Sequence, residues 1–286
     1  MWVFCCGMYR SASTLQFQIT THLVQQFDLG QVVGWIDANR FAEVRQQDKQ
    51  EAGLKVIKVH KCTEAIKTEF LKNNAIGIYA HRDVRDVYAS MMKQRQKSFE
   101  FLWNEGFLES CLENYRKWTS LPNVLVSQYQ KIIADPADEV RRIATHLQNP
   151  VDQDLRSSVI SAPLAPQSGG KQIESPPLLG DLGGKCVSPV DAKTCREIAD
   201  HYTIELQQER IGSFKQKLLQ LQRSPDDHRD IVDYHDESTL LHMNHIDAVK
   251  AGRWKDDLYP QEVAQIEQTV DVWCRQHDID AAIFLT

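Results

Sequence analysis

The chain has 286 residues, of which 42% are hydrophobic and 25% are charged, and its formal net charge at pH 7 is -6. These values exclude a disordered chain and are typical of a soluble globular protein. The mild acidity argues against a nucleic-acid partner, because such a partner requires a basic surface.

The sequence contains no run of about 18 apolar residues, so it offers no candidate membrane span. The first residues also lack the basic and apolar regions of a signal peptide. The seven cysteines include no CxxC pair, which argues against a disulfide framework and against a zinc site. We therefore expect a cytoplasmic protein.

Short apolar runs alternate with amphipathic stretches over the first 150 residues. Four apolar runs predict buried strands, at residues 3–6, 55–59, 75–80 and 123–127. Apolar residues at helical spacing predict helices at residues 15–27, 87–95, 99–118 and 140–147. Strands separated by helices indicate an α/β fold, in which both faces of a parallel sheet are covered.

The composition changes at about residue 161. Four of the ten prolines and five of the thirteen glycines lie in residues 161–188, which predicts an extended loop or lid. Ser188 is then expected to cap a helix that begins at Pro189, and the helical pattern continues to Leu221. A last helix is expected from about Pro260. We expect one domain with a C-terminal accessory half.

The segment from Gly7 to Thr14 joins the first predicted strand to the first predicted helix. Such a turn directs backbone N–H groups and the positive end of a helix toward a ligand, which is usually a phosphate. The hydroxyls of Ser11, Ser13 and Thr14 and the guanidinium of Arg10 add donors. The ATP-binding loop GxxxxGK[ST] would place its lysine at Ser13, so that lysine is absent. The segment is either an anion site or an ordinary polar turn.

A second candidate segment is Lys58, Val59 and His60, at the end of the second predicted strand. Ligands of open parallel sheets bind beyond the carboxyl ends of the strands, so His60 is expected to face the same crevice as Arg10. A histidine there has a pKa suited to proton abstraction near neutrality. The alternative is an ordinary hydrogen-bonded or surface histidine.

A third candidate segment, residues 82–90, again leads from a predicted strand into a helix. Arg82 and Ser90 are eight residues apart, a spacing that lets both side chains converge on one anion. The alternative is a solvated ion-pair cluster, since two arginines and two aspartates are adjacent here.

Together these segments resemble the sulfotransferases that use 3′-phosphoadenosine 5′-phosphosulfate (PAPS). Residues 10–14 match the family's 5′-phosphosulfate loop, and residues 58–60 match its strand-end signature with the catalytic base. Residues 82–90 match its 3′-phosphate signature R-x-x-[KR]-D-x-x-x-S throughout. Tyr129 occupies the position of the tyrosine that contacts the adenosine, and residues 252–254 resemble the C-terminal Gly-x-Trp element.

The resemblance implies a three-layer, P-loop-like α/β fold with a central parallel sheet flanked by helices. It implies transfer of a sulfuryl group from PAPS to a hydroxyl of a small-molecule acceptor, with His60 as general base, Lys58 as a second catalytic residue and no metal. Within a single domain of 1–286, residues 1–150 would bind the cofactor, 151–245 would form the variable acceptor or lid region, and 246–286 would close over the cofactor. The cofactor-binding residues would be Arg10, Ser11, Ala12, Ser13, Thr14, Arg82, Ser90, Tyr129, Lys250, Gly252 and Arg253.

The sequence departs from the family pattern at two places. Ala12 stands where the phosphosulfate loop has glycine, which narrows the backbone conformations available there. The Arg-Lys-Gly run expected shortly before Gly252 is missing, and Lys250 and Arg253 are the nearby basic residues that could replace its contact with the 3′-phosphate.

Other functions remain open at the level of the sequence. A P-loop small-molecule kinase would share the fold, and so would a non-catalytic nucleotide-binding protein. His228, His235, His242 and His245 lie near aspartates and could suggest a metal site. Only His242 and His245 have the spacing of two ligands on a helix, and no matching cysteine pair accompanies them, which argues against such a site. If His60 were structural, His235 or His242 would be the next candidates for the base. The sequence indicates neither the acceptor nor the oligomeric state.

Overall fold

The computed structural model describes residues 1–48, 52–148, 190–222, 236, 238–241, 246 and 251–286. Its centre is a five-stranded sheet in the order β2-β3-β1-β4-β5, and every neighbouring pair of strands is parallel. The strands are β1 (Trp2–Gly7), β2 (Gly30–Trp35), β3 (Leu54–Lys58), β4 (Ala75–His81) and β5 (Val124–Gln128). The predicted parallel sheet is therefore confirmed.

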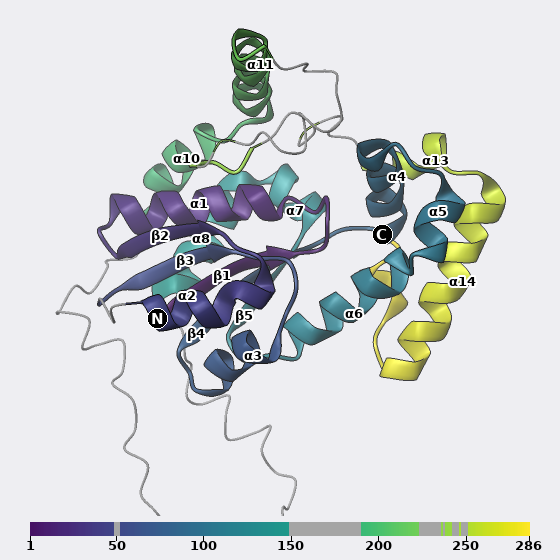
Figure 1. Cartoon of the computed structure of the whole chain (residues 1–286), viewed down its shortest axis with the longest axis horizontal. Helices are drawn as coiled ribbons and strands as arrows, with labels where there is room; N and C mark the ends of the chain where they lie inside the picture. The colour runs from purple at the N-terminus through teal and green to yellow at the C-terminus, as the bar shows by residue number, and fades with distance from the viewer. Residues whose placement is uncertain (49–51, 149–189, 223–235, 237, 242–245, 247–250) are drawn as a thin grey trace, which may run out of the picture.

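Alternate residues of the central strand β1 serve two separate cores. Val3 and Cys5 pack with α1 (Ser13–Gln26), α8 (Pro136–Gln148) and α10 (Ala192–Asp200) on one face of the sheet. Phe4 and Cys6 pack on the other face with α2 (Phe41–Gln47), α3 (Glu64–Leu71) and α6 (Phe107–Thr119). The molecule thus has three layers (Figure 1), as expected when both faces of a parallel sheet are buried.

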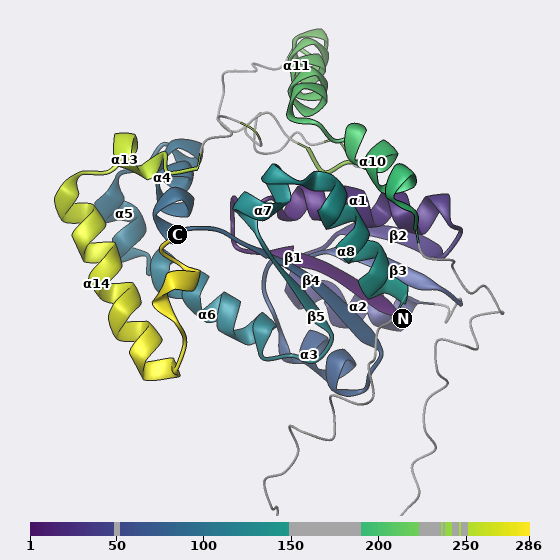
Figure 2. The same ribbon diagram turned by 180° about the vertical axis from the view of Figure 1, so that it is seen from behind.

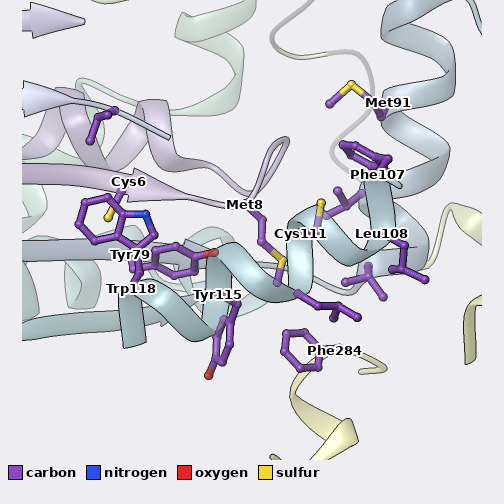
Figure 3. Packing of buried hydrophobic residues seen from close by; sticks show 14 of the residues in the cluster. Cys6, Met8, Tyr79, Met91, Phe107, Leu108, Cys111, Tyr115, Trp118 and Phe284 are labelled. Carbon is purple, nitrogen blue, oxygen red and sulfur yellow. The ribbon is translucent and has the colours of Figure 1, made fainter. Parts of the chain in front are cut away.

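Aromatic rings fill much of the second core. Figure 3 shows Tyr79, Tyr115 and Trp118 close together there. The ring of Tyr79 has its centroid 5.8 Å from that of Tyr115 and 6.5 Å from that of Trp118. The indole of Trp118 is fully buried, and its Nε1 donates a hydrogen bond to the carbonyl oxygen of His60. This core therefore supports the chain just after β3, where one of the candidate residues lies.

Further helices lie beyond the carboxyl end of the sheet, and both views show them there (Figures 1 and 2). These are α4 (Val84–Arg95), α5 (Phe99–Asn104), α13 (Trp254–Asp257) and α14 (Pro260–His277). The remaining elements are α7 (Tyr129–Ala134), α11 (Ile204–Gln220), η1 (Ala38–Arg40) and η4 (Ala281–Ile283). Pro260 is the first residue of α14, which confirms the predicted start of the last helix.

Several local predictions need correction. The strand β2 was not predicted, because it is an edge strand whose Val33 and Trp35 are exposed, so no continuous apolar run marks it. The helix predicted at 99–118 is broken into α5 and α6 at Gly106, whose φ of 66° ends one helix and precedes the next.

The helix expected from Ser188 begins instead at Ala192. The carboxylate of Asp191 caps it by accepting a hydrogen bond from the backbone N–H of Thr194. The helical pattern that follows is interrupted at residues 201–203, and the side chain of Thr203 caps the next helix, α11. The predicted lid at 161–188, the histidines 228, 235, 242 and 245, and Lys250 lie outside the described residues.

Candidate functional site

The loop that follows β1 shapes one side of a pocket at the carboxyl end of the sheet. Arg10 and Ala12 adopt φ values of 60° and 69°, both in the left-handed region. Such a conformation costs an alanine roughly 1 kcal/mol. The buried hydroxyl of Ser11 donates to the carbonyl oxygen of Met8 at 2.6 Å and also lies 3.0 Å from that of Ala80. The Ser11 side chain therefore holds the loop in this conformation.

The N-terminus of α1 opens onto this loop. No side chain caps the helix, and its first turn contains no acidic residue. Neither a capping group nor an acidic side chain therefore neutralises the positive end of the helix dipole. Ser13 and Thr14, the first two residues of the helix, line the pocket together with Arg10. This arrangement favours an anionic ligand at the position that the sequence predicted.

Lys58 brings a buried positive charge to the same helix end. The side chain lies at the end of β3, is only 2% exposed, and donates from Nζ to the hydroxyl of Ser13 at 2.9 Å. Burial lowers the pKa of Lys58 to about 8, and the nearby thiols of Cys5 and Cys6 act weakly in the other direction. Burial of the ammonium in this way costs free energy. Positive charges buried at such a cost are typical of sites that bind an anion.

His60 lies two residues further on, partly buried at the edge of the pocket. Its Nδ1 is 3.4 Å from the carbonyl oxygen of Gly7, and its ring stacks on Tyr9 with the centroids 4.7 Å apart. Burial, with a smaller contribution from the charge of Lys58, lowers the pKa of His60 to about 3. The imidazole is therefore neutral at physiological pH, and its pKa lies well below the value near neutrality that the sequence analysis expected, because the ring is buried beside a positive charge.

The third predicted segment meets the first one across the pocket. Arg10 donates from Nε to the hydroxyl of Ser90 at 2.9 Å, and Arg82 donates to the carbonyl oxygen of Arg10 at 3.4 Å. The guanidinium of Arg82 also lies over the ring of Tyr129, 4.1 Å from its centroid. The structure thus brings Arg10, Arg82, Ser90 and Tyr129 together, although they come from three separate parts of the sequence.

A residue that the sequence analysis did not single out, Asp86, connects this cluster to the C-terminal segment. Its buried carboxylate accepts hydrogen bonds from Arg82 at 3.1 Å, from the backbone N–H of Gly252 at 2.9 Å and from that of Trp254 at 3.1 Å. Arg253 consequently lies at the pocket wall. Asp86 belongs to the predicted 82–90 segment, but nothing in the sequence indicates partners more than 160 residues away.

The other wall of the pocket combines residues of α1 and α7 with residues from the region whose sequence matched no motif. Gln207 of α11 donates from its amide to the side-chain oxygen of Gln18 in α1 at 2.6 Å, and both side chains are buried. This contact holds the start of α11 against α1. The residues of this wall are Leu15, Gln18, Ile133, Tyr202, Ile204, Gln207, Leu241 and Ile246. The sequence did not indicate that Tyr202, Ile204, Gln207, Leu241 and Ile246 line the pocket, because they carry no motif.

Within the described residues, no group of three His, Cys, Asp or Glu side chains is arranged to hold a metal ion. No helix in that part of the chain is both long enough and apolar enough to cross a membrane.

Solved structures of similar fold contain a bound nucleotide. A structure of retinol dehydratase with retinol and PAP has a TM-score of 0.59 and 16% identity, and the match covers 98% of this chain and 82% of that one. Retinol dehydratase with androsterone and inactive cofactor PAP gives 0.58 and 16%, covering 98% and 81%. Mouse sulfotransferase SULT7A1 with PAP gives 0.50 and 12%, covering 96% and 84%.

At the level of sequence, no curated protein is significantly similar to this chain. The profile of the sulfotransferase domain, however, matches residues 7–162, which is more than half of the chain and includes all three segments at the pocket. The chain belongs to the sulfotransferase domain family.

Proposed function

We propose that this protein transfers the sulfuryl group of PAPS to a hydroxyl of a small-molecule acceptor. The observation that carries the proposal is the convergence of Arg10, Arg82 and the N-terminus of α1 on one pocket, beside the neutral imidazole of His60. Lys58 does not line the pocket, but it donates a hydrogen bond to the pocket residue Ser13. Family membership and the PAP-containing structures of similar fold support it.

The donors around the pocket fit a nucleotide with two separate anionic groups. The loop of residues 10–14 and Lys58 would hold the 5′-phosphosulfate, because they combine a helix N-terminus with a buried ammonium. Arg82 and Ser90 would hold the 3′-phosphate, together with Arg253. Lys250, which lies outside the described residues, stays a candidate for the same group.

The apolar wall on the other side of the pocket would contact the nucleobase and would border the place where the acceptor binds. Tyr129, Leu15 and Leu241 offer ring and aliphatic surface on the pocket side. The proposed division of the chain follows from this, with residues 1–150 holding most of the nucleotide and part of 151–245 completing the pocket.

Two side chains have distinct chemical roles in this proposal. When bound, PAPS supplies the sulfuryl group, and adenosine 3′,5′-bisphosphate (PAP) is the product. Because the carbonyl of Gly7 can only accept, the 3.4 Å contact favours a proton on Nδ1 of His60 and leaves Nε2 able to accept the proton of the acceptor hydroxyl. Lys58 and Ser13 stabilise negative charge that develops at the 5′-phosphate.

The decisive variant is His60→Ala. We expect turnover to fall about a hundredfold to ten-thousandfold, the range for removal of a general base, while the Kd for PAP stays nearly unchanged. Lys58→Ala is the matched comparison, since it should weaken both turnover and PAP binding. If His60→Ala keeps most of its activity between about pH 6 and 9, another group is the base.

A substrate screen separates the proposed reaction from its rivals. Purified protein with PAPS and a mixture of alcohols, phenols and sugars should give an acceptor mass shifted by one sulfuryl group. Turnover of ATP with magnesium would indicate a kinase instead. Tight binding of PAP with no product from any acceptor would indicate a non-catalytic nucleotide-binding protein.

A further inference from the structure

The ring of Tyr9 packs directly against the imidazole of His60. Anion binding by the loop does not require this contact. Tyr9 lies in the loop after β1, beside Arg10, and its ring stacks on the imidazole with an interplanar angle of 30° and a centroid distance of 4.7 Å. Both rings line the pocket. A residue at this position therefore borders the proposed base directly.

Tyr9 also contacts a buried ring of the second core. Its ring lies 6.1 Å from that of Phe107, the first residue of α6, which is buried in the second core (Figure 3). Phe107 is held in turn by an edge-on contact with the fully buried Tyr88, at 5.5 Å. Tyr9 is thus in contact with both a buried aromatic ring and the imidazole.

Two hydrogen bonds of His60 also bear on the position of its ring. Trp118 donates to the main-chain carbonyl of His60, a contact that holds the backbone and does not involve the ring. The contact of Nδ1 with Gly7 is long for a hydrogen bond, at 3.4 Å. The stack with Tyr9, with the centroids 4.7 Å apart, therefore contributes to holding the plane of the ring.

We propose that Tyr9 is a positioning residue that holds the imidazole of His60 with Nε2 toward the pocket, and that its ring forms the wall against which the acceptor docks. This inference rests on the proposed function, in which His60 is the base. The aromatic ring performs this role through its flat face, so phenylalanine should replace it and an aliphatic side chain should not.

Kinetics of Tyr9→Leu and Tyr9→Phe test the proposal. A small misplacement of a catalytic group costs about tenfold to a hundredfold in rate, so Tyr9→Leu should lower kcat by that factor, whereas Tyr9→Phe should stay within about threefold of the wild type. The Kd for PAP should change less than about twofold in both variants, because Tyr9 acts on the base and the acceptor.

Tyr115→Leu is the matched control. Tyr115 is a buried tyrosine of the same core that packs on Tyr79 and Phe284 and makes no ring contact with His60. Its loss reports the effect of removing an aromatic ring from this core without touching the base. If Tyr9→Leu fails to fold, Tyr9→Met is the substitute, because it fills the space with a side chain that cannot stack as a ring.

A second measurement does not depend on activity. Because the two rings stack with their centroids 4.7 Å apart, the ring current of Tyr9 should shift the NMR signals of the His60 ring protons. These signals should therefore move in Tyr9→Leu and remain near their wild-type positions in Tyr9→Phe and Tyr115→Leu. Signals that do not move in Tyr9→Leu overturn the proposed stack. Unchanged kcat in Tyr9→Leu, or an equal loss in Tyr9→Phe, overturns the positioning role.

The kinetic and NMR measurements together distinguish a failure of this inference from a failure of the proposed function. If the wild type transfers no sulfuryl group to any acceptor, the proposed function fails, and the NMR comparison still decides whether Tyr9 orients His60. If the wild type is active and Tyr9→Leu equals it in kcat, the function stands and the role of Tyr9 is rejected.

Discussion

Replacement of Asp86 should weaken folding and nucleotide binding together, because one carboxylate holds α4 to the C-terminal segment. Its side chain is fully buried, and its two oxygens accept from Arg82, Gly252 and Trp254. Asp86→Ala removes all three contacts and takes the buried carboxylate away from Arg82, whose side chain is 6% exposed. Breaking a buried charge pair from one side costs about 3–5 kcal/mol, and we expect the free energy of unfolding to fall by that amount.

The same substitution should affect the two phosphate positions unequally. Arg82 and the Gly252 segment both belong to the proposed 3′-phosphate site, so Asp86→Ala misplaces donors there and leaves the loop after β1 intact. A charge-assisted hydrogen bond contributes about 1.5–3 kcal/mol, which corresponds to roughly tenfold to a hundredfold in Kd. Affinity for PAP should therefore fall by that factor, and affinity for adenosine 5′-monophosphate should fall much less.

Urea denaturation gives the stability of these variants, and calorimetry gives the two affinities. The matched control is Asp138→Ala, since Asp138 pairs with Arg141 on the surface of α8, with side chains 42% and 60% exposed. Loss of an exposed pair costs less than about 1 kcal/mol. An Asp86→Ala protein as stable as this control would refute the buried-pair reasoning. An equal loss of affinity for both nucleotides would refute the assignment of the 3′-phosphate site.

Two more predictions follow from the pocket. Arg82→Ala should abolish the preference for PAP over adenosine 5′-monophosphate, a loss of roughly tenfold to a hundredfold that calorimetry measures; a preference that persists would place the 3′-phosphate elsewhere. The kcat/KM for PAPS should fall as the pH rises through about 8, because Lys58 then loses its proton and its charge. His60, with a pKa of about 3, stays neutral over the same range and adds no acid limb above about pH 5. An alkaline limb that persists in Lys58→Met would contradict this origin.

The local pattern of the sequence was sufficient for the parallel sheet and for three segments of the site. Apolar runs such as that in β1 are buried on both faces, and a buried parallel strand requires such a run. In a parallel sheet the carboxyl ends of β1, β3 and β4 lie at the same edge, so Arg10, Lys58 and Arg82 were predictable as lying close together there.

Only the tertiary structure decided the features that depend on distant contacts. The edge strand β2 is stabilised by its pairing with β3. Because side chains such as Trp35 are exposed, the sequence of this strand lacks the apolar run that marks a buried strand. Asp86 acquires its role from Gly252, 166 residues away, and Tyr9 from His60 across the sheet edge. Such pairings leave no periodic signal, because their energy comes from burial and geometry that exist only once the chain is folded.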